Sequence, residues 1–421
     1  MKKIRIVGAG LAGSEAINYL AKKGYDIEVF ECKSNKPNSA QHTPFFAELV
    51  CSNSLKSISS TNACGLLKKE LEKLDSLIME AADLFKIPSG EDLSVDRTLF
   101  SQYITKKIKE YSNVSIIEEE YTDLDDSVPT IIATGPLTSD SLATNIEKSL
   151  GIKTLNFYDA AAPLVFASSI DKTKMFERSR YDKGEGKYLN ISLNEEEYNL
   201  FNDELVNAER TILHDFEHFE GCLPMEVMAK RGKNTLRFGP LKPAGLDDKA
   251  YAVVQLRQDD ISKELYGLVG FQTNLTYKEQ KRVFSLIPGL ENAKFARFGL
   301  MHSNLFLNAP AVLNRDLRLK KYNNIYIAGQ FSGVEGYVES AASGLLAAIY
   351  LDQRLKGKEI DFIPLETMLG SLINYIIMSS PKHFAPMNST YGILYNRGKL
   401  DKTECYNRSM DRMDEWKKRM I

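Results

Sequence analysis

A glycine-rich turn near the amino terminus constrains the fold of this chain more than any other segment. The turn, GAGLAG at residues 8–13, follows the short β-branched stretch IRIV and precedes a segment of helical periodicity at residues 14–23. In such a unit Gly8 permits a tight turn, Gly10 lets the backbone approach a pyrophosphate, and Gly13 lets the helix pack on the strand. The pattern predicts that a dinucleotide lies at the amino end of the helix, where free N–H groups favour negative charge.

A second expected strand, residues 26–30, ends at Glu31. An acid about 20 residues after the glycine turn is placed to bind ribose hydroxyls, and it disfavours a 2′-phosphate, so NADP is not expected here. An adenine dinucleotide, FAD above all, is the predicted ligand. The residues of this segment expected to bind it are Gly8, Ala9, Gly10, Leu11, Ala12, Gly13 and Glu31.

Two later segments are expected to complete the same site. TIIATG at residues 130–135 and IYIAGQ at residues 325–330 are both buried strands that end in glycine. A small-residue helix at residues 340–350 follows the second, and its amino end would point at the flavin ring. The additional cofactor contacts predicted from these segments are Thr134, Gly135, Gly329, Gln330 and Gly333.

The distance between these segments along the chain predicts a discontinuous domain. We expect an α/β, Rossmann-like FAD-binding domain built from residues 1–178 and 292–421, with an α+β domain inserted at residues 179–291. Acidic stretches, Gly/Pro-punctuated loops and strand-like runs such as residues 251–256 mark the inserted part.

Composition narrows the classes of function. The five cysteines form no CxxC pair and the five histidines are poorly spaced for a metal, so neither a disulfide framework nor a metal site is expected. No signal peptide and no membrane-spanning run are recognised, which favours a cytoplasmic protein. The net charge is −2, so a polyanion would need a local basic patch. The candidate patch, just after Cys222, is Lys230, Arg231, Lys233, Arg237 and Lys242.

Longer runs resemble the folate- and FAD-dependent RNA uridine-5-methyltransferases, over nearly the whole chain from residue 4 to about 350. The resemblance rests on the runs GAGLAGSEA, AELVCSNSL, TNACGLLKKELEKLDSLIMEAAD, IIATGPLTSD, FYDAAAP, SRYDKGE, FEGCLPMEVMAKRG, RFGPLKPAGL, AVVQLRQD, GFQTNLTYKEQKRVFSLIPGLENA and AGQFSGVEGYVESAASGLLA. These runs are specific, because no general flavoprotein pattern demands CSNSL or GCLPMEVMA. The flavoprotein that modifies the wobble uridine of tRNA is a broader relative.

The resemblance implies a reaction and two catalytic cysteines. Cys222 matches the family nucleophile that adds to C6 of uracil, which makes C5 able to attack a one-carbon unit. Cys51 matches a second cysteine beside the flavin, assigned to the methylene or to the C5 proton. Methylenetetrahydrofolate would supply the carbon, FAD would relay and reduce it, and NAD(P)H would re-reduce the flavin. A flat pterin ring needs an aromatic neighbour, for which Tyr337 and Phe331 are candidates.

Two departures from the family pattern leave the RNA substrate open. Gln41 stands where the family usually has His, and Ser303 where it has Arg, a bidentate contact that serine cannot replace. Both a tRNA uridine and a 23S rRNA uridine stay possible targets. A flavin- and RNA-binding paralogue that does not methylate is the alternative function, and an NAD(P)H-flavin oxidoreductase acting on a small molecule is a third. The oligomeric state is not predicted.

Overall fold

A five-stranded parallel sheet forms the first part of the molecule. The computed structural model describes residues 3–38, 40–184, 186–211 and 223–420. The sheet order is β16-β7-β1-β2-β6, and every neighbouring pair is parallel. Its strands are β1 (Lys3–Val7), β2 (Asp26–Phe30), β6 (Val114–Ile117), β7 (Thr130–Ile132) and β16 (Ile325–Ile327). Because β16 joins from the distant part of the chain, the α/β Rossmann-like fold is confirmed, together with its discontinuous sheet.

Two helices that carry glycine-rich turns at their amino ends pack directly on one another. They are α1 (Leu11–Lys22) and α11 (Tyr337–Leu355). A Cβ added to Gly344 of α11 would overlap the backbone of Ala12 in α1, so only glycine allows this approach. The close packing of the two helices fixes the glycine turn of α1 relative to the amino end of α11.

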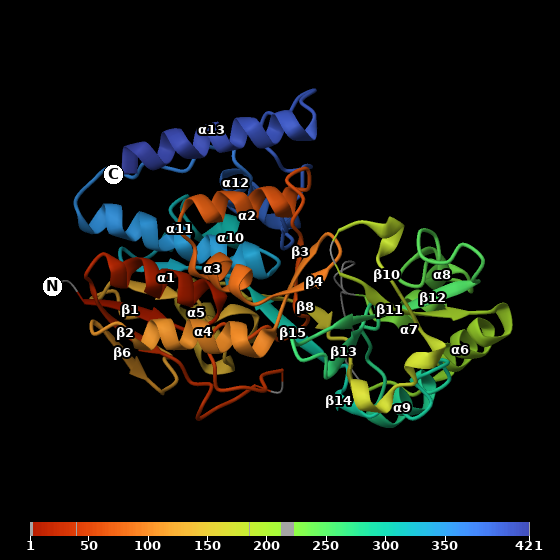
Figure 1. Ribbon diagram of the computed structural model, residues 1–421. Coiled ribbons are helices and arrows are strands. Elements are labelled where there is room, and N and C mark those ends of the chain that lie inside the picture. Colours follow the sequence, from red (N-terminus) through yellow and green to blue (C-terminus); the bar gives the residue numbers. More distant parts are fainter. Residues whose placement is uncertain (1–2, 39, 185, 212–222, 421) are drawn as a thin grey trace.

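Further helices continue this first part of the molecule, up to the helix at the carboxyl terminus (Figure 1). The helices beyond α1 and α11 are α2 (Ala63–Lys73), α3 (Leu77–Leu84), α4 (Arg97–Lys109), α5 (Asp140–Leu150), α10 (Ala309–Val312), α12 (Met368–Met378) and α13 (Lys402–Met420). The Glu70 carboxylate of α2 ties three of them together. It accepts hydrogen bonds from the N–H groups of Met368 (2.6 Å) and Leu369 (2.8 Å) and from the Ser409 hydroxyl (2.5 Å). It thereby caps α12 and anchors α13.

A six-stranded sheet forms the second part, with a hydrophobic core of its own. Its order is β10-β11-β12-β13-β9-β14, and its neighbouring strands are antiparallel. The strands are β9 (Leu164–Phe166), β10 (Phe176–Arg178), β11 (Tyr188–Leu193), β12 (Ala252–Gln258), β13 (Leu265–Leu268) and β14 (Phe295–Arg297). The helices of this part are α6 (Glu195–Asn207), α7 (Met225–Lys230), α8 (Thr235–Phe238) and α9 (Tyr277–Phe284). The sheet therefore draws strands from both sides of the expected 179–291 insertion.

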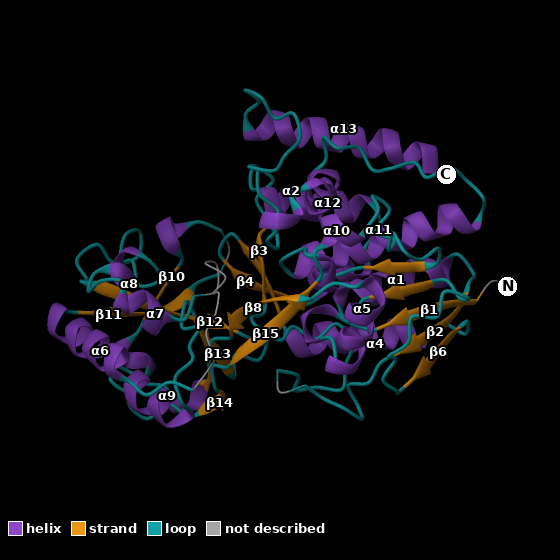
Figure 2. Ribbon diagram, turned by 180° about the vertical axis from the view of Figure 1, so that it is seen from behind, coloured by secondary structure: helices purple, strands orange, loops and turns teal. Residues whose placement is uncertain are grey.

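Short strands connect the two parts. The antiparallel pair β8 (Leu155–Ala160) and β15 (Met301–Phe306) lies between the two large sheets in both views (Figures 1 and 2). A three-stranded sheet of β3 (Ser54–Ser57), β5 (Asp92–Val95) and β4 (Lys86–Ser89) lies beside it. Among the described helices, none combines the length and apolar character needed to cross a membrane.

The contact between α1 and α11 predicts how a substitution at Gly344 changes the stability of the protein. We expect Gly344→Ala to lower the free energy of unfolding by about 1–3 kcal/mol, because the added methyl group must push the two helices apart. Urea unfolding followed by circular dichroism measures the change. Gly392→Ala is the matched control, since its nearest neighbouring atom would lie 3.8 Å away. Equal losses in both variants would contradict the proposed role of the contact.

Candidate functional site

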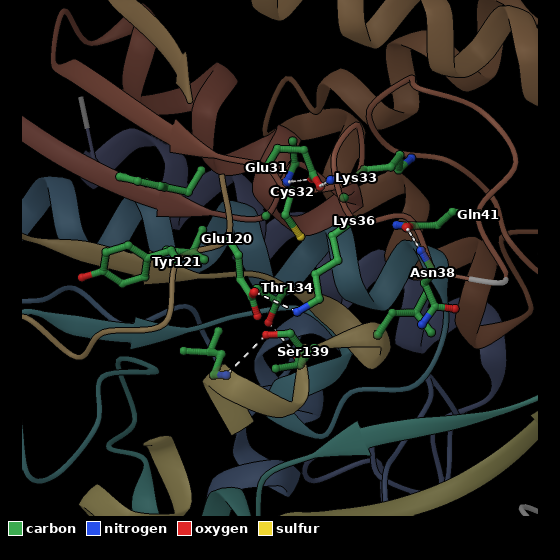
Figure 3. Close-up of a pocket in the computed structure, with 18 of the residues that line it drawn as sticks. Glu31, Cys32, Lys33, Lys36, Asn38, Gln41, Glu120, Tyr121, Thr134 and Ser139 are labelled. Atoms are coloured by element: carbon green, nitrogen blue, oxygen red, sulfur yellow. Dashed lines mark hydrogen bonds and ion pairs between the residues drawn. The ribbon is translucent and has the colours of Figure 1, made fainter. Parts of the chain in front are cut away.

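A cavity of about 320 Å³ opens at the carboxyl ends of β1, β2 and β7. Gly8 closes the turn at φ +92°, and a Cβ there would lie 2.7 Å from the Ala133 carbonyl oxygen. Lys36 and Glu120 point toward one another across the cavity and form an ion pair of 2.8 Å (Figure 3). Of the predicted cofactor contacts, the cavity is lined by Gly8, Ala9, Gly10, Glu31 and Thr134.

The amino end of α1 is suited to an anion. Gly10 is the N-cap residue, no side chain caps the helix, and its first turn contains no acidic residue. Free N–H groups and the helix dipole therefore face the cavity, and a Cβ on Gly10 would meet nothing within 4 Å. The pyrophosphate of a dinucleotide fits these features.

Glu31 is held in place at the end of β2. Its Oε2 accepts a hydrogen bond from the Ala9 N–H (2.8 Å), and its Oε1 accepts one from the Lys33 N–H (3.0 Å). These bonds fix a carboxylate at the rim of the cavity, where a ribose hydroxyl can donate to it.

The other predicted cofactor residues lie elsewhere. Leu11, Ala12 and Gly13 do not line this cavity: Gly13 packs on the Gly8 carbonyl group, and Ala12 packs against Gly329 and Gly344. Gln330 lines a different cavity, described below. Gly135 and Gly333 both adopt positive φ angles and shape the backbone, and neither lines a cavity described here.

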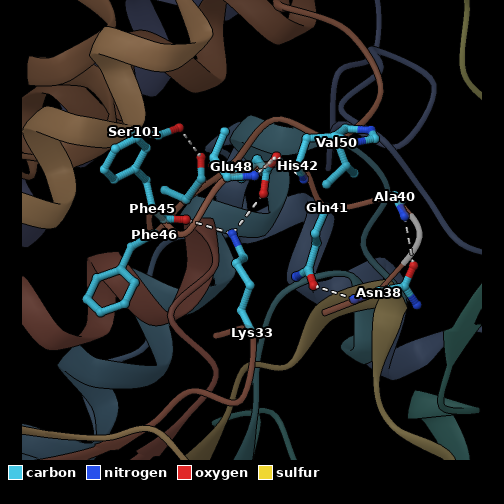
Figure 4. Close-up of polar contacts among 12 residues, drawn as sticks. Lys33, Asn38, Ala40, Gln41, His42, Phe45, Phe46, Glu48, Val50 and Ser101 are labelled. Carbon is cyan, nitrogen blue, oxygen red and sulfur yellow. Dashed lines mark hydrogen bonds and ion pairs between the residues drawn. The ribbon is translucent and has the colours of Figure 1, made fainter. Parts of the chain in front are cut away.

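A buried ion pair between Lys33 and Glu48 fixes the segment that runs from this cavity to the next ones. The Lys33 Nζ lies 2.9 Å from the Glu48 carboxylate and 2.6 Å from the Phe45 carbonyl oxygen (Figure 4). Glu48 also accepts hydrogen bonds from the N–H groups of His42 and Thr43. Gln41, one of the departures noted above, uses its side-chain oxygen to accept from the Asn38 N–H (2.9 Å). Its side chain thus stabilises its own loop.

Cys51 lines a second cavity, of about 240 Å³. Val50 lines both cavities, so the two adjoin. The polar side chains of the second cavity include Cys51, Asp159, Gln272, His302, Asn304, Gln330, Glu335 and Tyr337. Tyr337, the first residue of α11, brings the amino end of that helix to the cavity. The helix begins three residues before the expected range of 340–350.

Two arginines and a tyrosine hold the backbone around Cys51. The Tyr337 hydroxyl accepts hydrogen bonds from the N–H groups of Cys51 (2.7 Å) and Ser52 (3.2 Å). Arg297 of β14 donates to the carbonyl oxygens of Val50 (3.2 Å) and Cys51 (2.9 Å).

Arg97 of α4 holds the backbone at Leu49, two residues before Cys51. It donates to the Leu49 carbonyl oxygen (3.2 Å) and pairs with Asp259 of the second part (2.6 Å). Residues of both parts therefore fix the position of Cys51.

The Cys51 thiol is protonated at neutral pH in this environment. Its pKa is raised to about 12, mainly by burial and secondly by the negative charge of Asp159, against an opposing effect of Arg297. The nearby arginines favour the thiolate, but desolvation disfavours it more strongly. The surroundings therefore do not activate this cysteine.

Glu335 places a second bound proton in the same cavity. Burial raises its pKa to about 8, and the charge of Asp159 adds to the effect. Its carboxyl group accepts a hydrogen bond from Gln330 (2.6 Å). Asp159 itself has an oxygen, Oδ1, that is buried without a partner among the described residues. The cavity thus combines a protonated carboxyl, an unpartnered acceptor and a thiol.

A third cavity, of about 420 Å³, shares Val50 and His302 with its neighbours. The rings of Tyr277 and Phe298 stack at its wall with centroids 4.7 Å apart. Arg97 and Arg297 also line it, and the Nε atom of each is buried without a partner among the described residues. A flat, polar ligand fits such a lining.

Ser303 faces away from these cavities. It lies between His302 and Asn304 on β15, and successive side chains of a strand point to opposite faces. His302 and Asn304 line the Cys51 cavity, whereas Ser303 does not.

Cys222 lies outside the described residues, so the structure does not test its position. Shortly after it, the Met225 N–H donates to the Gln272 carbonyl oxygen (2.7 Å), and Gln272 lines the Cys51 cavity. The chain that follows Cys222 therefore runs beside this cavity.

The predicted basic patch divides in two. Lys230, Arg231 and Lys233 are exposed. The Arg237 guanidinium lies 3.8 Å from the ring centroid of Tyr251 and donates to its carbonyl oxygen, so it serves packing. Of the two aromatic candidates, Phe331 is fully buried and Tyr337 lines the Cys51 cavity.

Sequence reasoning missed Arg97, Arg297, Asp159 and Glu335. Asp159 and Glu335 stand inside the matching runs FYDAAAP and AGQFSGVEGYVESAASGLLA, which could have drawn attention to them. Within the described residues, no group of three or more His, Cys, Asp or Glu side chains is arranged to hold a metal ion.

Comparisons with known proteins agree with this arrangement. Residues 3–359 match the family model described as "Glucose inhibited division protein A". The chain is 52% identical over 402 residues to the methylenetetrahydrofolate--tRNA-(uracil-5-)-methyltransferase TrmFO of Lactobacillus johnsonii, covering 94% of this chain and 92% of that protein. It is 52% identical over 400 residues to the protein of that name from Listeria monocytogenes, covering 93% and 92%.

The structure of Aquifex aeolicus GidA superimposes with a TM-score of 0.71, at 16% identity, over 98% of this chain and 73% of that one. At this identity the likeness establishes the fold.

The protonated state of Cys51 predicts slow alkylation near neutral pH. Iodoacetamide labelling, quantified by mass spectrometry of peptides, should be slow at about pH 7 and rise steadily toward about pH 10. Asp159→Asn removes a negative charge that raises the thiol pKa, and should speed labelling up to about tenfold. Asp203→Asn, on the exposed side of α6, is the control. Fast labelling at about pH 7 in the wild type would refute the assignment.

Glu335 predicts a pH-dependent stability. Its carboxyl group keeps a proton up to about pH 8 when folded, against a usual pKa of 4.5. Between these values the folded state binds the extra proton, so the free energy of unfolding falls as pH rises. Glu335→Gln should reduce this slope by the contribution of one carboxyl, at most about 1.4 kcal/mol per pH unit, while the buried Glu15 and Glu70, whose pKa values are also raised, keep theirs.

Urea unfolding of the protein as purified, from about pH 5 to 8, measures the slope. Glu196→Gln on exposed α6 should leave it unchanged. Parallel curves for wild type and Glu335→Gln would contradict the role of burial.

Proposed function

Since the chain belongs to the family of methylenetetrahydrofolate--tRNA-(uracil-5-)-methyltransferases, we propose that it methylates C5 of a tRNA uridine with FAD and methylenetetrahydrofolate. One observation carries the proposal: Cys51 lies in a cavity that adjoins the dinucleotide cavity and that is lined by residues of both parts. A thiol beside a flavin site suits a flavin reaction that involves covalent or proton-transfer chemistry.

FAD fits the first two cavities. We assign the pyrophosphate to the amino end of α1 and a ribose hydroxyl to Glu31, with Thr134 at the opposite wall. Val50, Gln330 and the amino end of α11 would hold the flavin end. Leu11, Ala12, Gly13, Gly135, Gly329 and Gly333 support the cofactor by shaping the backbone around it. When bound and reduced, FAD supplies the electrons that convert the one-carbon unit to a methyl group, and NAD(P)H restores them.

The cysteines divide the covalent chemistry. The Cys222 thiolate adds to C6 of uracil, so the C5–C6 double bond opens and C5 attacks the one-carbon unit. The C5 proton must then leave, and the thiolate is expelled as the double bond re-forms. Cys51 is the proposed proton acceptor, and its raised pKa makes its thiolate a strong base. It must first lose its own proton, and Asp159 has an unpartnered oxygen in the same cavity.

The third cavity is our candidate for the folate. It adjoins the Cys51 cavity through Val50 and His302, so a ligand there can present a carbon to the flavin end. Its stacked aromatic wall suits a pterin ring, and its two arginines suit polar or anionic groups.

The RNA target narrows to tRNA. The curated relatives described above are named as tRNA methyltransferases, which favours tRNA over the 23S rRNA left open by the sequence. The departures at Gln41 and Ser303 leave the Cys51 cavity unchanged, because neither side chain lines it. Gln41 lines the dinucleotide cavity, where its side-chain oxygen is bonded to its own loop, so it gives no specific support to a non-methylating paralogue. Lys230, Arg231 and Lys233 are the proposed contacts to RNA phosphates. The cytoplasm is the proposed compartment.

Turnover on defined RNAs tests the function. Reduced enzyme with labelled methylenetetrahydrofolate should form 5-methyluridine in an unmodified tRNA transcript, detected by mass spectrometry of nucleosides. A 23S rRNA fragment should give none. Product on rRNA alone would reassign the substrate, and no product on either RNA would refute methylation.

Cysteine variants test the assigned roles in the same assay. Cys222→Ala should retain flavin absorbance but fail to trap an RNA that contains 5-fluorouridine. Cys51→Ala should lose product formation by at least about 100-fold, the typical contribution of a positioned acid–base group. Cys64→Ala, whose thiol contacts the Ser57 carbonyl oxygen outside these cavities, is the control. Trapping retained in Cys222→Ala would move the nucleophile elsewhere.

A further inference from the structure

Two aromatic side chains of the second part are strongly exposed. Phe238, the last residue of α8, is 72% exposed, and Tyr181, just after β10, is 58% exposed. Single exposed aromatic residues are common and need no explanation. These two differ because one loop, residues 239–246, connects them structurally.

That loop holds Tyr181 in a fixed orientation. The Tyr181 N–H donates to the Gly245 carbonyl oxygen (2.7 Å), and a Cβ on Gly245 would lie 2.6 Å from the Tyr181 ring. Tyr181 itself has a φ of +58°, which is unfavourable for a residue with a side chain. Its neighbour Arg180 donates to the Lys242 carbonyl oxygen (3.0 Å). One face of the ring therefore rests on the backbone of the loop while much of the side chain remains in water.

Phe238 directly precedes the same loop in the chain. The Arg237 guanidinium lies 5.4 Å from its ring centroid and 3.8 Å from that of Tyr251. The packing of Arg237 on Tyr251 anchors α8 while leaving Phe238 in solvent. Figures 1 and 2 both show α8 near β10, at the edge strand of the second sheet.

The charge along the chain around Phe238 favours a polyanion, whereas the acid next to Tyr181, Asp182, is paired with Arg178. Residues 227–246 contain no Asp or Glu and five basic residues, in a protein whose net charge is −2. Lys233 and Lys242, on either side of Phe238 in the chain, are exposed. Cations that alternate with exposed rings are the arrangement used for unpaired nucleotides, with phosphates on the cations and bases on the rings.

The loop also leads to the candidate site. A Cβ on Gly270 would overlap Pro240, so the two residues are in direct contact. Gln272, two residues further along, lines the Cys51 cavity. The loop is therefore joined by direct packing to a segment that lines the Cys51 cavity.

We propose that Phe238 and Tyr181 form a stacking platform for unpaired bases of the RNA substrate, with Lys233 and Lys242 on its phosphates. The proposal rests on the proposed function and adds to it the residues that contact the RNA away from the cavity. Unpaired bases are the expected contacts, since paired bases offer no free face for stacking.

Substitutions that remove the aromatic ring but keep a large apolar side chain test the platform. Phe238→Leu keeps an apolar side chain but removes the ring, and should weaken binding of an unmodified tRNA transcript by about 5- to 100-fold. Phe238→Trp should restore it. Binding is measured by fluorescence anisotropy with the flavin-loaded enzyme. Leu200→Ala, at a 53% exposed position of α6, is the control and should bind as the wild type does.

A blunt-ended RNA duplex of equal length is the second probe. Phe238→Leu should leave its affinity unchanged, whereas Lys242→Ala should weaken both RNAs and lower the salt dependence of binding by about one ion. Equal binding of the tRNA by wild type and Phe238→Leu would overturn the platform. So would equal weakening on tRNA and duplex.

The outcomes separate this proposal from the function on which it rests. A wild type that forms 5-methyluridine, together with a Phe238→Leu variant that binds tRNA normally, would refute the platform alone. A wild type that neither binds nor methylates RNA would refute both. A change in oligomeric mass of Phe238→Leu with unchanged RNA affinity would overturn the platform and assign the rings to a protein contact.

Discussion

The contact between α1 and α11 is the constraint on which the site depends. Ala12 of α1 touches both Gly344, within α11, and Gly329, in the turn before it. Because a Cβ on Gly344 would overlap the Ala12 backbone, the two helices approach at backbone distance, and a Cβ on Gly329 would lie only 3.1 Å from the Ala12 Cβ. This approach places the open amino end of α1 and the amino end of α11 on neighbouring cavities that share Val50. A site for a long, two-ended cofactor thus follows from one close packing contact.

Desolvation is the dominant electrostatic effect around Cys51. The pKa values of Cys51, Glu335 and Tyr337 are all raised with burial as the largest cause, so each group keeps its proton at neutral pH. Arg297 shows the same effect with opposite sign, since burial lowers its pKa to about 10, yet it stays charged. These three groups of the cavity are therefore protonated when no ligand is bound. Chemistry that needs a thiolate there requires a change in charge or solvation when ligands bind.

The sequence predicted the elements that carry local patterns and missed those that depend on distant contacts. The strands at residues 26–30 and 325–327 and the helix after the GAGLAG turn were anticipated because their periodicity or flanking turns are local. The helix expected at residues 340–350 is longer, Tyr337–Leu355, and begins directly after Gly336. Arg97 and Arg297 carry no local pattern: they matter because the fold brings them to the backbone around Cys51.

The basic run after Cys222 shows how structure changes the meaning of a charge pattern. Counted along the chain, five cations suggest one electrostatic patch, but Arg237 stacks on Tyr251 and is committed to packing. The remaining exposed cations are close to the exposed Phe238 along the chain, and the whole protein is slightly acidic. Long-range attraction of RNA is therefore weak, and discrimination must come from short-range contacts. Rigid rings on a loop that packs near the Cys51 cavity suit this requirement, because little conformational entropy is lost when bases stack on them.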